Sequence, residues 1–116
     1  MKAPRQADLV VAVPLFGEDV APRFCYASEV LVARVESGQV CSRRRLAMDG
    51  LPWPERIRVL AGLHVELILA GGFDRRVLPM AAGCGIEVLW GLTGDAEQIL
   101  DALCRGKLPT GQKEAG

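Results

Sequence analysis

The chain lacks the closely spaced cysteines and histidines that build most metal centres on a single segment. Its four cysteines, Cys25, Cys41, Cys84 and Cys104, form no Cys-x-x-Cys pair, and it has one histidine. Structural zinc sites and iron–sulfur clusters assembled on a chain usually draw on closely spaced thiolates. The spacing fits neither kind of centre, and disulfides are not expected in a cytosolic domain of this size.

The sequence also lacks an excess of either charge and any long apolar run. Fourteen Lys and Arg balance fourteen Asp and Glu, so no global field attracts nucleic acid. The longest apolar run is far shorter than the roughly 20 residues of a membrane span, and no clean signal-peptide pattern follows the first residues. We expect a cytoplasmic protein that binds neither membrane nor nucleic acid.

What the chain does contain is the composition of one globular domain. Half of its residues are hydrophobic and 24% are charged, which is enough for an ordinary core. We expect a single domain over residues 1–116, with an ordered core at about 8–108. Residues 109–116 are rich in Pro, Gly and charge, which predicts a disordered tail.

Five segments predict the strands of one sheet. The first is apolar without alternation, as in a strand covered on both faces. Ser37-Gly38 predicts a tight hairpin between the second and the third. Helices are expected at 54–63, 73–83 and 95–105, and right-handed crossovers then place the last two strands parallel to the first. The strands are, in order, Leu9–Pro14, Val30–Glu36, Gln39–Ala47, Val65–Ala70 and Ile86–Trp90.

The predicted fold class is therefore α/β, a three-layer domain with a mixed five-stranded sheet in the order 3-2-1-4-5 and an antiparallel second strand. The carboxyl ends of the first, fourth and fifth strands then face one rim of the sheet. We expect this rim to bring together the loop Arg23–Cys25, the pair Gly71-Gly72 and the segment Gly91–Thr93.

The loop after the first strand carries the main candidate residues. Arg23, Phe24 and Cys25 lie in a stretch broken by Gly and Pro, and a rigid strand that ends in an irregular loop is a good scaffold for a site. Two structural interpretations remain open beside the functional one. Arg23 could form a surface salt bridge with Glu18 or Asp19, and Cys25 could be a buried small hydrophobe.

A second candidate segment follows the fourth strand. Gly71-Gly72 either brings backbone amides close to a ligand or only allows a tight turn. Asp74 is the expected N-cap of the next helix, with Arg75 and Arg76 in its first turn. Pro79 falls beyond the positions where a missing amide costs nothing, so it predicts a kink or a delayed helix start.

Three further features have both a structural and a functional interpretation. Arg43–Arg45 suggests an edge strand protected by charge, with a basic lip for an anionic partner as the alternative. His64 is expected to interact with the last carbonyls of a helix rather than to bind a metal. Trp53 is expected to cover the core rather than to contact a ligand.

A resemblance to a known family covers residues 9 to about 108. The segments that carry it are VAVPLFGEDVAPRFCYASEVLVARVESGQV and ILAGGFDRRVLPMAAGCGIEVLWGLTGDAEQILDALCRGKL, and they resemble the dinitrogenase iron–molybdenum-cofactor-binding family. The resemblance implies a ribonuclease-H-like fold. It also implies non-catalytic binding or carriage of a preformed molybdenum-containing metal–sulfur cluster. That cluster would be like the iron–molybdenum cofactor or, as in the similar orange proteins, a molybdenum–copper sulfide.

The chain departs from the family in the loop that matters most. The family loop typically reads Pro-His-Phe-Gly, and this chain has Pro-Arg-Phe-Cys at 22–25. Arginine cannot coordinate a metal, but the thiolate of Cys25 is an apt ligand for soft centres and could replace the imidazole. Preformed clusters are anions, so Arg23, with Arg75 or Arg76 and glycine amides, could hold one by charge and hydrogen bonds.

We therefore expect a non-catalytic cluster binder whose partners are the inorganic cluster and a protein that donates or accepts it. A hydrolase would need several carboxylates around a divalent metal, and the central strand has none. The other alternative is a regulatory or protein-interaction module with a vestigial site. The absence of the family's histidine from the loop at 22–25 favours this alternative. The expected metal ligand is Cys25, and the expected cluster-binding residues are Arg23, Phe24, Cys25, Gly71, Gly72, Arg75, Arg76 and Thr93.

Overall fold

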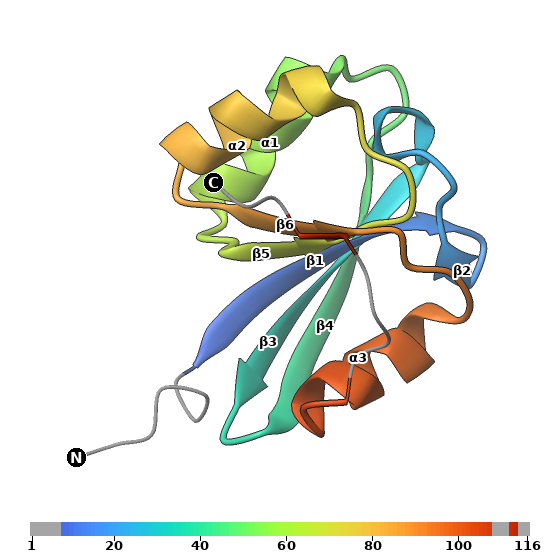
Figure 1. Cartoon of the computed structure of the whole chain (residues 1–116), viewed down its shortest axis with the longest axis vertical. Coiled ribbons are helices and arrows are strands. Elements are labelled where there is room, and N and C mark those ends of the chain that lie inside the picture. Colours follow the sequence, from blue (N-terminus) through green and yellow to red (C-terminus); the bar gives the residue numbers. More distant parts are fainter. Residues whose placement is uncertain (1–7, 108–111, 114–116) are drawn as a thin grey trace.

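A computed structural model gives the fold of residues 8–107 and 112–113 (Figure 1). Three helices and two single 3-10 turns (η2, η3) alternate with strands along the chain. The elements are β1 (Leu9–Phe16), β2 (Asp19–Val20), η2 (Phe24–Tyr26), β3 (Glu29–Glu36), β4 (Gln39–Ala47), α1 (Trp53–Gly62), β5 (Leu67–Leu69), η3 (Arg75–Val77), α2 (Leu78–Gly83), β6 (Glu87–Trp90), α3 (Ala96–Cys104) and β7 (Gln112–Lys113). None of the helices in the described part of the chain has the length and apolarity to cross a membrane.

The strands form one mixed, open sheet, which confirms the predicted α/β class. Its path runs β4-β3-β1-β5-β6-β7, and β2 pairs with β1 beside that path. β1 is antiparallel to β3 and parallel to β5, and β5 is parallel to β6. The five predicted strands correspond to β1, β3, β4, β5 and β6, and β2 and β7 are additional. The ribonuclease-H-like layout stays a prediction.

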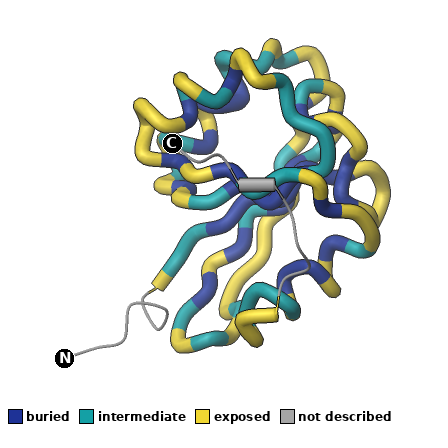
Figure 2. The backbone as a smooth tube through the Cα atoms, in the orientation of Figure 1, coloured by how far each residue is buried: buried dark blue, intermediate teal, exposed yellow. Residues whose placement is uncertain are grey.

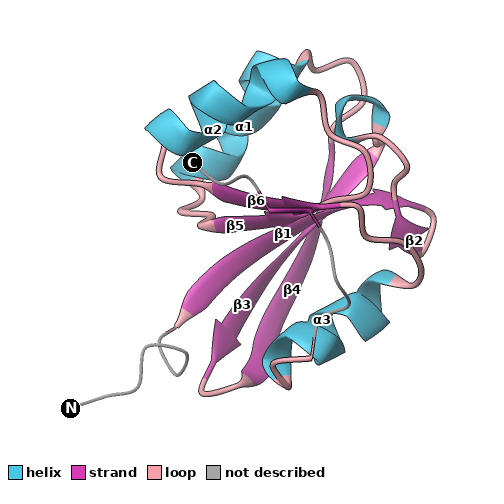
Figure 3. Ribbon diagram, viewed as in Figure 1, coloured by secondary structure: helices cyan, strands magenta, loops and turns pink. Residues whose placement is uncertain are grey.

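Helices cover both faces of the sheet: α1 and α2 lie on one side and α3 on the other (Figure 3). Side chains of β1 alternate between the two faces, since Ala12 packs with α1 residues such as Ile57, whereas Val11 and Val13 pack with α3 residues such as Leu100. The buried stretches of backbone follow these central strands (Figure 2). β1 is therefore covered on both faces, as its run of valines predicts.

The helices begin where capping and proline chemistry allow. Asp95 accepts a hydrogen bond from the Gln98 amide at 3.1 Å and caps α3. Residues 73–83 do not form one continuous helix, because α2 begins only at Leu78 and Pro79 lies in its first turn, where a missing amide is tolerated. The delayed helix start that Pro79 predicts is confirmed.

One part of the predicted disordered tail belongs to the sheet. Residues 1–7 and most of the predicted tail at 109–116 lie outside the described residues. Within that tail, however, Gln112–Lys113 forms β7, antiparallel to β6. Pairing of β7 satisfies backbone groups on the otherwise open edge of β6, which is a long-range effect that composition does not reveal.

The three arginines lie on β4, which is an edge strand as predicted. Arg43 donates to both oxygens of Glu97 on α3, and Arg45 pairs with Glu29 and Glu18. Alternation along the strand places the intervening Arg44 on the opposite face, and among the described residues it forms no ion pair. Two of the three cations are thus neutralised by carboxylates, which favours the structural interpretation over a basic lip.

The loops after β1 and β5 touch through their backbones. The Gly72 amide donates to the Pro22 carbonyl at 2.7 Å, and the Phe24 amide donates to the Gly72 carbonyl at 3.0 Å. A Cβ at Gly72 would overlap the Pro22 carbonyl oxygen, and a Cβ at Gly71 would lie 2.5 Å from that of Ala21. The glycine pair therefore permits close backbone approach, and the Gly72 amide is not free for a ligand.

We predict that Gly72→Ala lowers the free energy of unfolding by about 2–3 kcal/mol, because the added methyl group forces the two loops apart. Gly83→Ala is the matched control, since nothing lies within 4 Å of a Cβ there, and alanine favours the helix. Urea unfolding followed by circular dichroism measures both. Equal stability of Gly72→Ala and the wild type would contradict the close contact.

Candidate functional site

A cavity of about 640 Å³ lies at the loops that follow β1 and β5. Three segments line it: residues 22–26, the pair Pro52-Trp53 at the start of α1, and the residues Gly72, Phe73, Asp74 and Arg76. Its volume is within the range of small-ligand sites.

The turn Phe24–Tyr26, here called the Cys25 turn, places the thiol in this cavity. The Tyr26 amide donates to the Arg23 carbonyl at 3.2 Å, and the Ala27 amide donates to the Phe24 carbonyl at 3.3 Å. Cys25 lies in the middle of this turn, half-buried and lining the cavity. The backbone contact to Gly72 fixes the turn against the loop that carries Asp74 and Arg76.

Aromatic side chains form the apolar part of the cavity wall. Phe24 is fully buried, and its ring packs against that of Phe73 with centroids 4.9 Å apart. Trp53 is half-buried and contacts the core as predicted, but it also lines the cavity. Tyr26 lines it with 78% of its surface exposed. Such a wall excludes water from the deep side of the cavity and leaves the outer side open.

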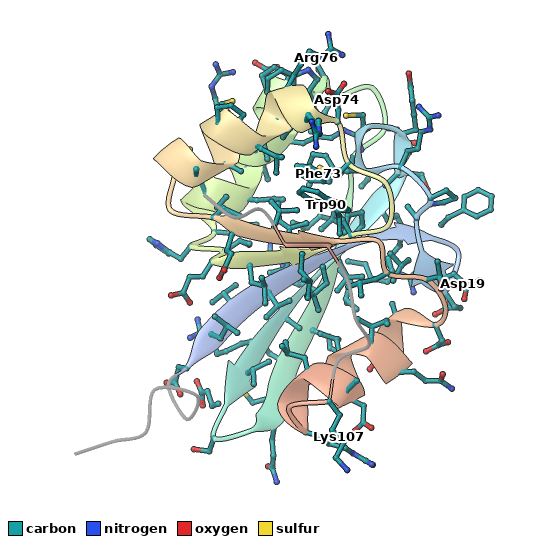
Figure 4. The ribbon with its side chains drawn as sticks, viewed as in Figure 1. Asp19, Phe73, Asp74, Arg76, Trp90 and Lys107 are labelled. Carbon is teal, nitrogen blue, oxygen red and sulfur yellow. The ribbon has the colours of Figure 1, made fainter. Side chains whose placement is uncertain are left out.

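Asp74, the only carboxylate among the described residues that line the cavity, is paired with one of the cavity's cations. Arg76 donates to both oxygens of Asp74, the shortest contact being 2.6 Å. Figure 4 shows Phe73, Asp74 and Arg76 on the side of the sheet that α2 covers. The side-chain and backbone hydrogen bonds from Arg76 lower the pKa of the Asp74 carboxyl to about 2. This pair therefore contributes no net charge to the cavity at neutral pH.

Arg23 contributes a cation that is not compensated. Its side chain is exposed, lines the cavity and has no hydrogen bond or ion pair within residues 8–107. The alternative salt bridge to Glu18 or Asp19 is not formed, and Glu18 pairs with Arg45 instead. Arg23 is thus available to an anion that enters the cavity.

The Cys25 side chain is protonated in the ligand-free protein at neutral pH. Burial raises the pKa of its thiol and the Asp74 carboxylate raises it further, whereas Arg56, Arg76 and Arg23 lower it. A metal centre that binds this sulfur must therefore displace a proton. Within the described residues, no group of three or more His, Cys, Asp or Glu side chains could hold a bare metal ion.

Arg56 is a site residue that the sequence reasoning missed. It is 4% exposed and donates to the carbonyls of Leu51, Phe24, Ala27 and Met48 at 2.6–3.1 Å. These bonds tie the Cys25 turn to the start of α1. A signal was present, since Arg56 precedes Leu60 by four positions and so shares the inward face of the helix.

Not every predicted site residue reaches the cavity. Arg23, Phe24, Cys25, Gly72 and Arg76 line it, but Gly71, Arg75 and Thr93 do not. The expected gathering at the rim occurs in part: the Gly91 amide donates to the Gly71 carbonyl at 2.9 Å, but none of the residues Gly91–Thr93 lines the cavity beside the Cys25 turn. The Val20 amide donates to the Gly94 carbonyl and the Ala96 amide to the Glu18 carbonyl, and these bonds hold that loop to β2, toward α3.

The remaining candidate ligands also lie away from the cavity. His64 follows α1 with a φ of 65°, and its backbone amide donates to the Ala61 carbonyl at 3.0 Å. The predicted interaction with helix carbonyls is therefore made by the backbone, and no hydrogen bond of the imidazole is found among the described residues. Cys84 ends α2 and is exposed.

Comparison with known proteins identifies the fold. No family model and no curated protein matches the sequence. A crystal structure of PH0822 matches with a TM-score of 0.82 and 19% identity, over 88% of this chain and 96% of that one. A "putative dinitrogenase (mj0327)" from Methanocaldococcus jannaschii matches with a TM-score of 0.77 and 14% identity, over 95% and 98%. The apo form of orange protein from Desulfovibrio gigas matches with a TM-score of 0.68 and 20% identity, over 87% and 91%.

These neighbours agree with the family that the sequence resembles. At such identities the likeness shows that this chain has the fold of those proteins.

We predict that Arg56→Met lowers the free energy of unfolding by about 3 kcal/mol, because four carbonyls lose a charged donor. Arg58→Met is the matched control on the same helix. Its side chain is 62% exposed and, among the described residues, pairs with Glu55 alone, so the expected loss is within about 0.5 kcal/mol. Guanidinium chloride titration distinguishes them, and equal losses would show that the four bonds contribute little.

Proposed function

We propose that this chain, which has the fold of orange protein and of the Methanocaldococcus jannaschii protein, binds and carries a preformed molybdenum-containing metal–sulfur cluster without catalysing a reaction on it. One observation carries the proposal: a thiol, Cys25, and an uncompensated guanidinium, Arg23, line the same aromatic-walled cavity of about 640 Å³. The cargo is either an iron–molybdenum–sulfur cluster or a molybdenum–copper sulfide.

The chemistry of the lining residues suits such a cargo. Molybdenum, iron and copper in sulfide clusters are soft centres, for which the thiolate of Cys25 is an apt ligand. The cluster is an anion, and Arg23 can reach it with planar, charge-assisted hydrogen bonds. The Phe24 and Phe73 rings and Trp53 supply an apolar surface against the sulfides.

The small number of protein ligands is consistent with carriage. A bare ion needs several donors from the protein, and no such group exists in the described part of the chain. A preformed cluster brings its own sulfide bridges, so that one protein thiolate and ionic contacts suffice to hold it. A carrier must also release its cargo, so its expected partner is a protein that donates or accepts the cluster.

Reconstitution tests this function directly. We predict that the protein incubated with tetrathiomolybdate and copper(I) retains a visible charge-transfer band after desalting. Cys25→Ser should abolish retention because it removes the ligand, and Arg23→Ala should weaken binding about tenfold because it removes a charge-assisted contact. Cys84→Ser, an exposed thiol outside the cavity, is the control and should behave as the wild type.

The outcomes separate the parts of the proposal. No band with either thiomolybdate and copper or iron–molybdenum cofactor would refute cluster binding. If Cys25→Ser retains the band as well as the wild type does, the Cys25 sulfur is not a ligand of the cluster. If Cys25→Ser and Arg23→Ala both retain it fully, the cluster binds outside this cavity.

Asp74 sets how strongly an anion is held. We predict that Asp74→Asn strengthens tetrathiomolybdate binding about fivefold, because it removes the carboxylate from the cavity and releases Arg76. Asparagine is an equally good helix cap, so the loop should keep its shape. Asp101→Asn, which breaks the similar pair with Arg105 on α3, should leave the affinity unchanged. Equilibrium dialysis measures both, and weaker binding by Asp74→Asn would contradict this role.

A further inference from the structure

Arg56 is the one charged residue that is buried among the described residues, and no carboxylate is bonded to it. Its four acceptors are main-chain carbonyls, which carry no formal charge. Asp49, whose charge acts on Arg56, is exposed and forms no ion pair with it. Burying a cation without a counter-ion lowers the stability of a folded protein, so a buried Arg56 is expected to have a role beyond packing.

That place is directly behind the cavity. The guanidinium holds the carbonyls of Phe24 and Ala27, which flank the cavity-lining residues Cys25 and Tyr26. It also holds the carbonyl of Leu51, which precedes the cavity-lining pair Pro52-Trp53. The cation therefore lies between two of the three segments that form the wall, on their inner side.

The charges around the cavity do not cancel. Asp74 neutralises Arg76, and no other carboxylate in the described part of the chain lines the cavity. Arg23 on the open side and Arg56 behind the wall remain as two cations without an ion-paired partner among the described residues. Arg56 is held in place by four bonds, so its field on the cavity is fixed and, being shielded from water, is screened less than that of Arg23.

We propose that Arg56 is a specificity-determining residue, whose buried charge makes the cavity select dianionic over monoanionic metal sulfides. This inference rests on the proposed function and adds to it the charge of the cargo. Arg56 acts through the field it sets up and through the turn it holds, and it does not touch the cargo. A purely structural clamp would give no such selection, because loss of the clamp would weaken all anions equally.

Two thioanions of the same tetrahedral shape separate these roles. Tetrathiomolybdate is a dianion and tetrathioperrhenate is a monoanion, so the ratio of their dissociation constants reports charge selection while shape is constant. We expect the wild type to prefer the dianion, and Arg56→Met to reduce that preference about tenfold, the effect of one charge at an effective dielectric constant of about 20. Arg56→Lys, which keeps the charge with fewer donors, should retain most of the preference.

Arg58→Met is the control, and its ratio should equal that of the wild type because this exposed arginine pairs with Glu55 outside the cavity. A ratio unchanged in Arg56→Met would overturn the inference and leave cluster binding intact. A wild type that binds both anions equally would overturn it without any variant, even if Arg56→Met fails to fold. A wild type that binds neither anion would also overturn the inference, and the reconstitution with thiomolybdate and copper or with iron–molybdenum cofactor would then decide separately whether the proposed function fails as well.

Discussion

The site depends on a contact between two backbones rather than between side chains. β1 and β5 are parallel neighbours, and the loops that follow them meet again where Gly72 bonds to Pro22 and Phe24. That contact brings the Cys25 turn, which follows the first strand, against the loop of Phe73 and Asp74, which follows the other. Because a side chain on Gly72 would strike the Pro22 carbonyl, the cavity exists only if the loops can approach this closely.

Most of the fold could be predicted because its signals are local. The valine run of β1 indicates burial on both faces, Ser37-Gly38 indicates the hairpin, and Asp95 indicates the start of α3. The short strands β2 and β7 could not be predicted, since two residues are too few for a periodic pattern and their pairing is decided by tertiary context. The same holds for the place of Thr93, because the next residue, Gly94, accepts a hydrogen bond from Val20 of β2 that no local pattern encodes.

The site was predicted in part for a similar reason. Arg23 and Cys25 could be found because they lie in a loop broken by glycine and proline at the end of a buried strand. Whether Arg75 or Arg76 lines the cavity depends on the 3-10 turn η3, which contains both residues and directly precedes α2, and the sequence does not specify this turn. Arg56 could not be predicted because helical periodicity marks the inward face of α1 by its apolar residues, whereas a long cationic side chain can share that face if carbonyls satisfy it.

Because the cavity is lined by arginine and not by histidine, its charge responds little to pH. A site built on imidazole changes its charge between about pH 5 and 8. Guanidinium groups stay charged throughout that interval, and the Asp74 carboxyl, with a pKa of about 2, stays ionised. No histidine lines this cavity, so the charges of its arginines and of Asp74 stay constant between about pH 5 and 8, and acid weakens binding there only through the proton that a metal centre must displace from Cys25.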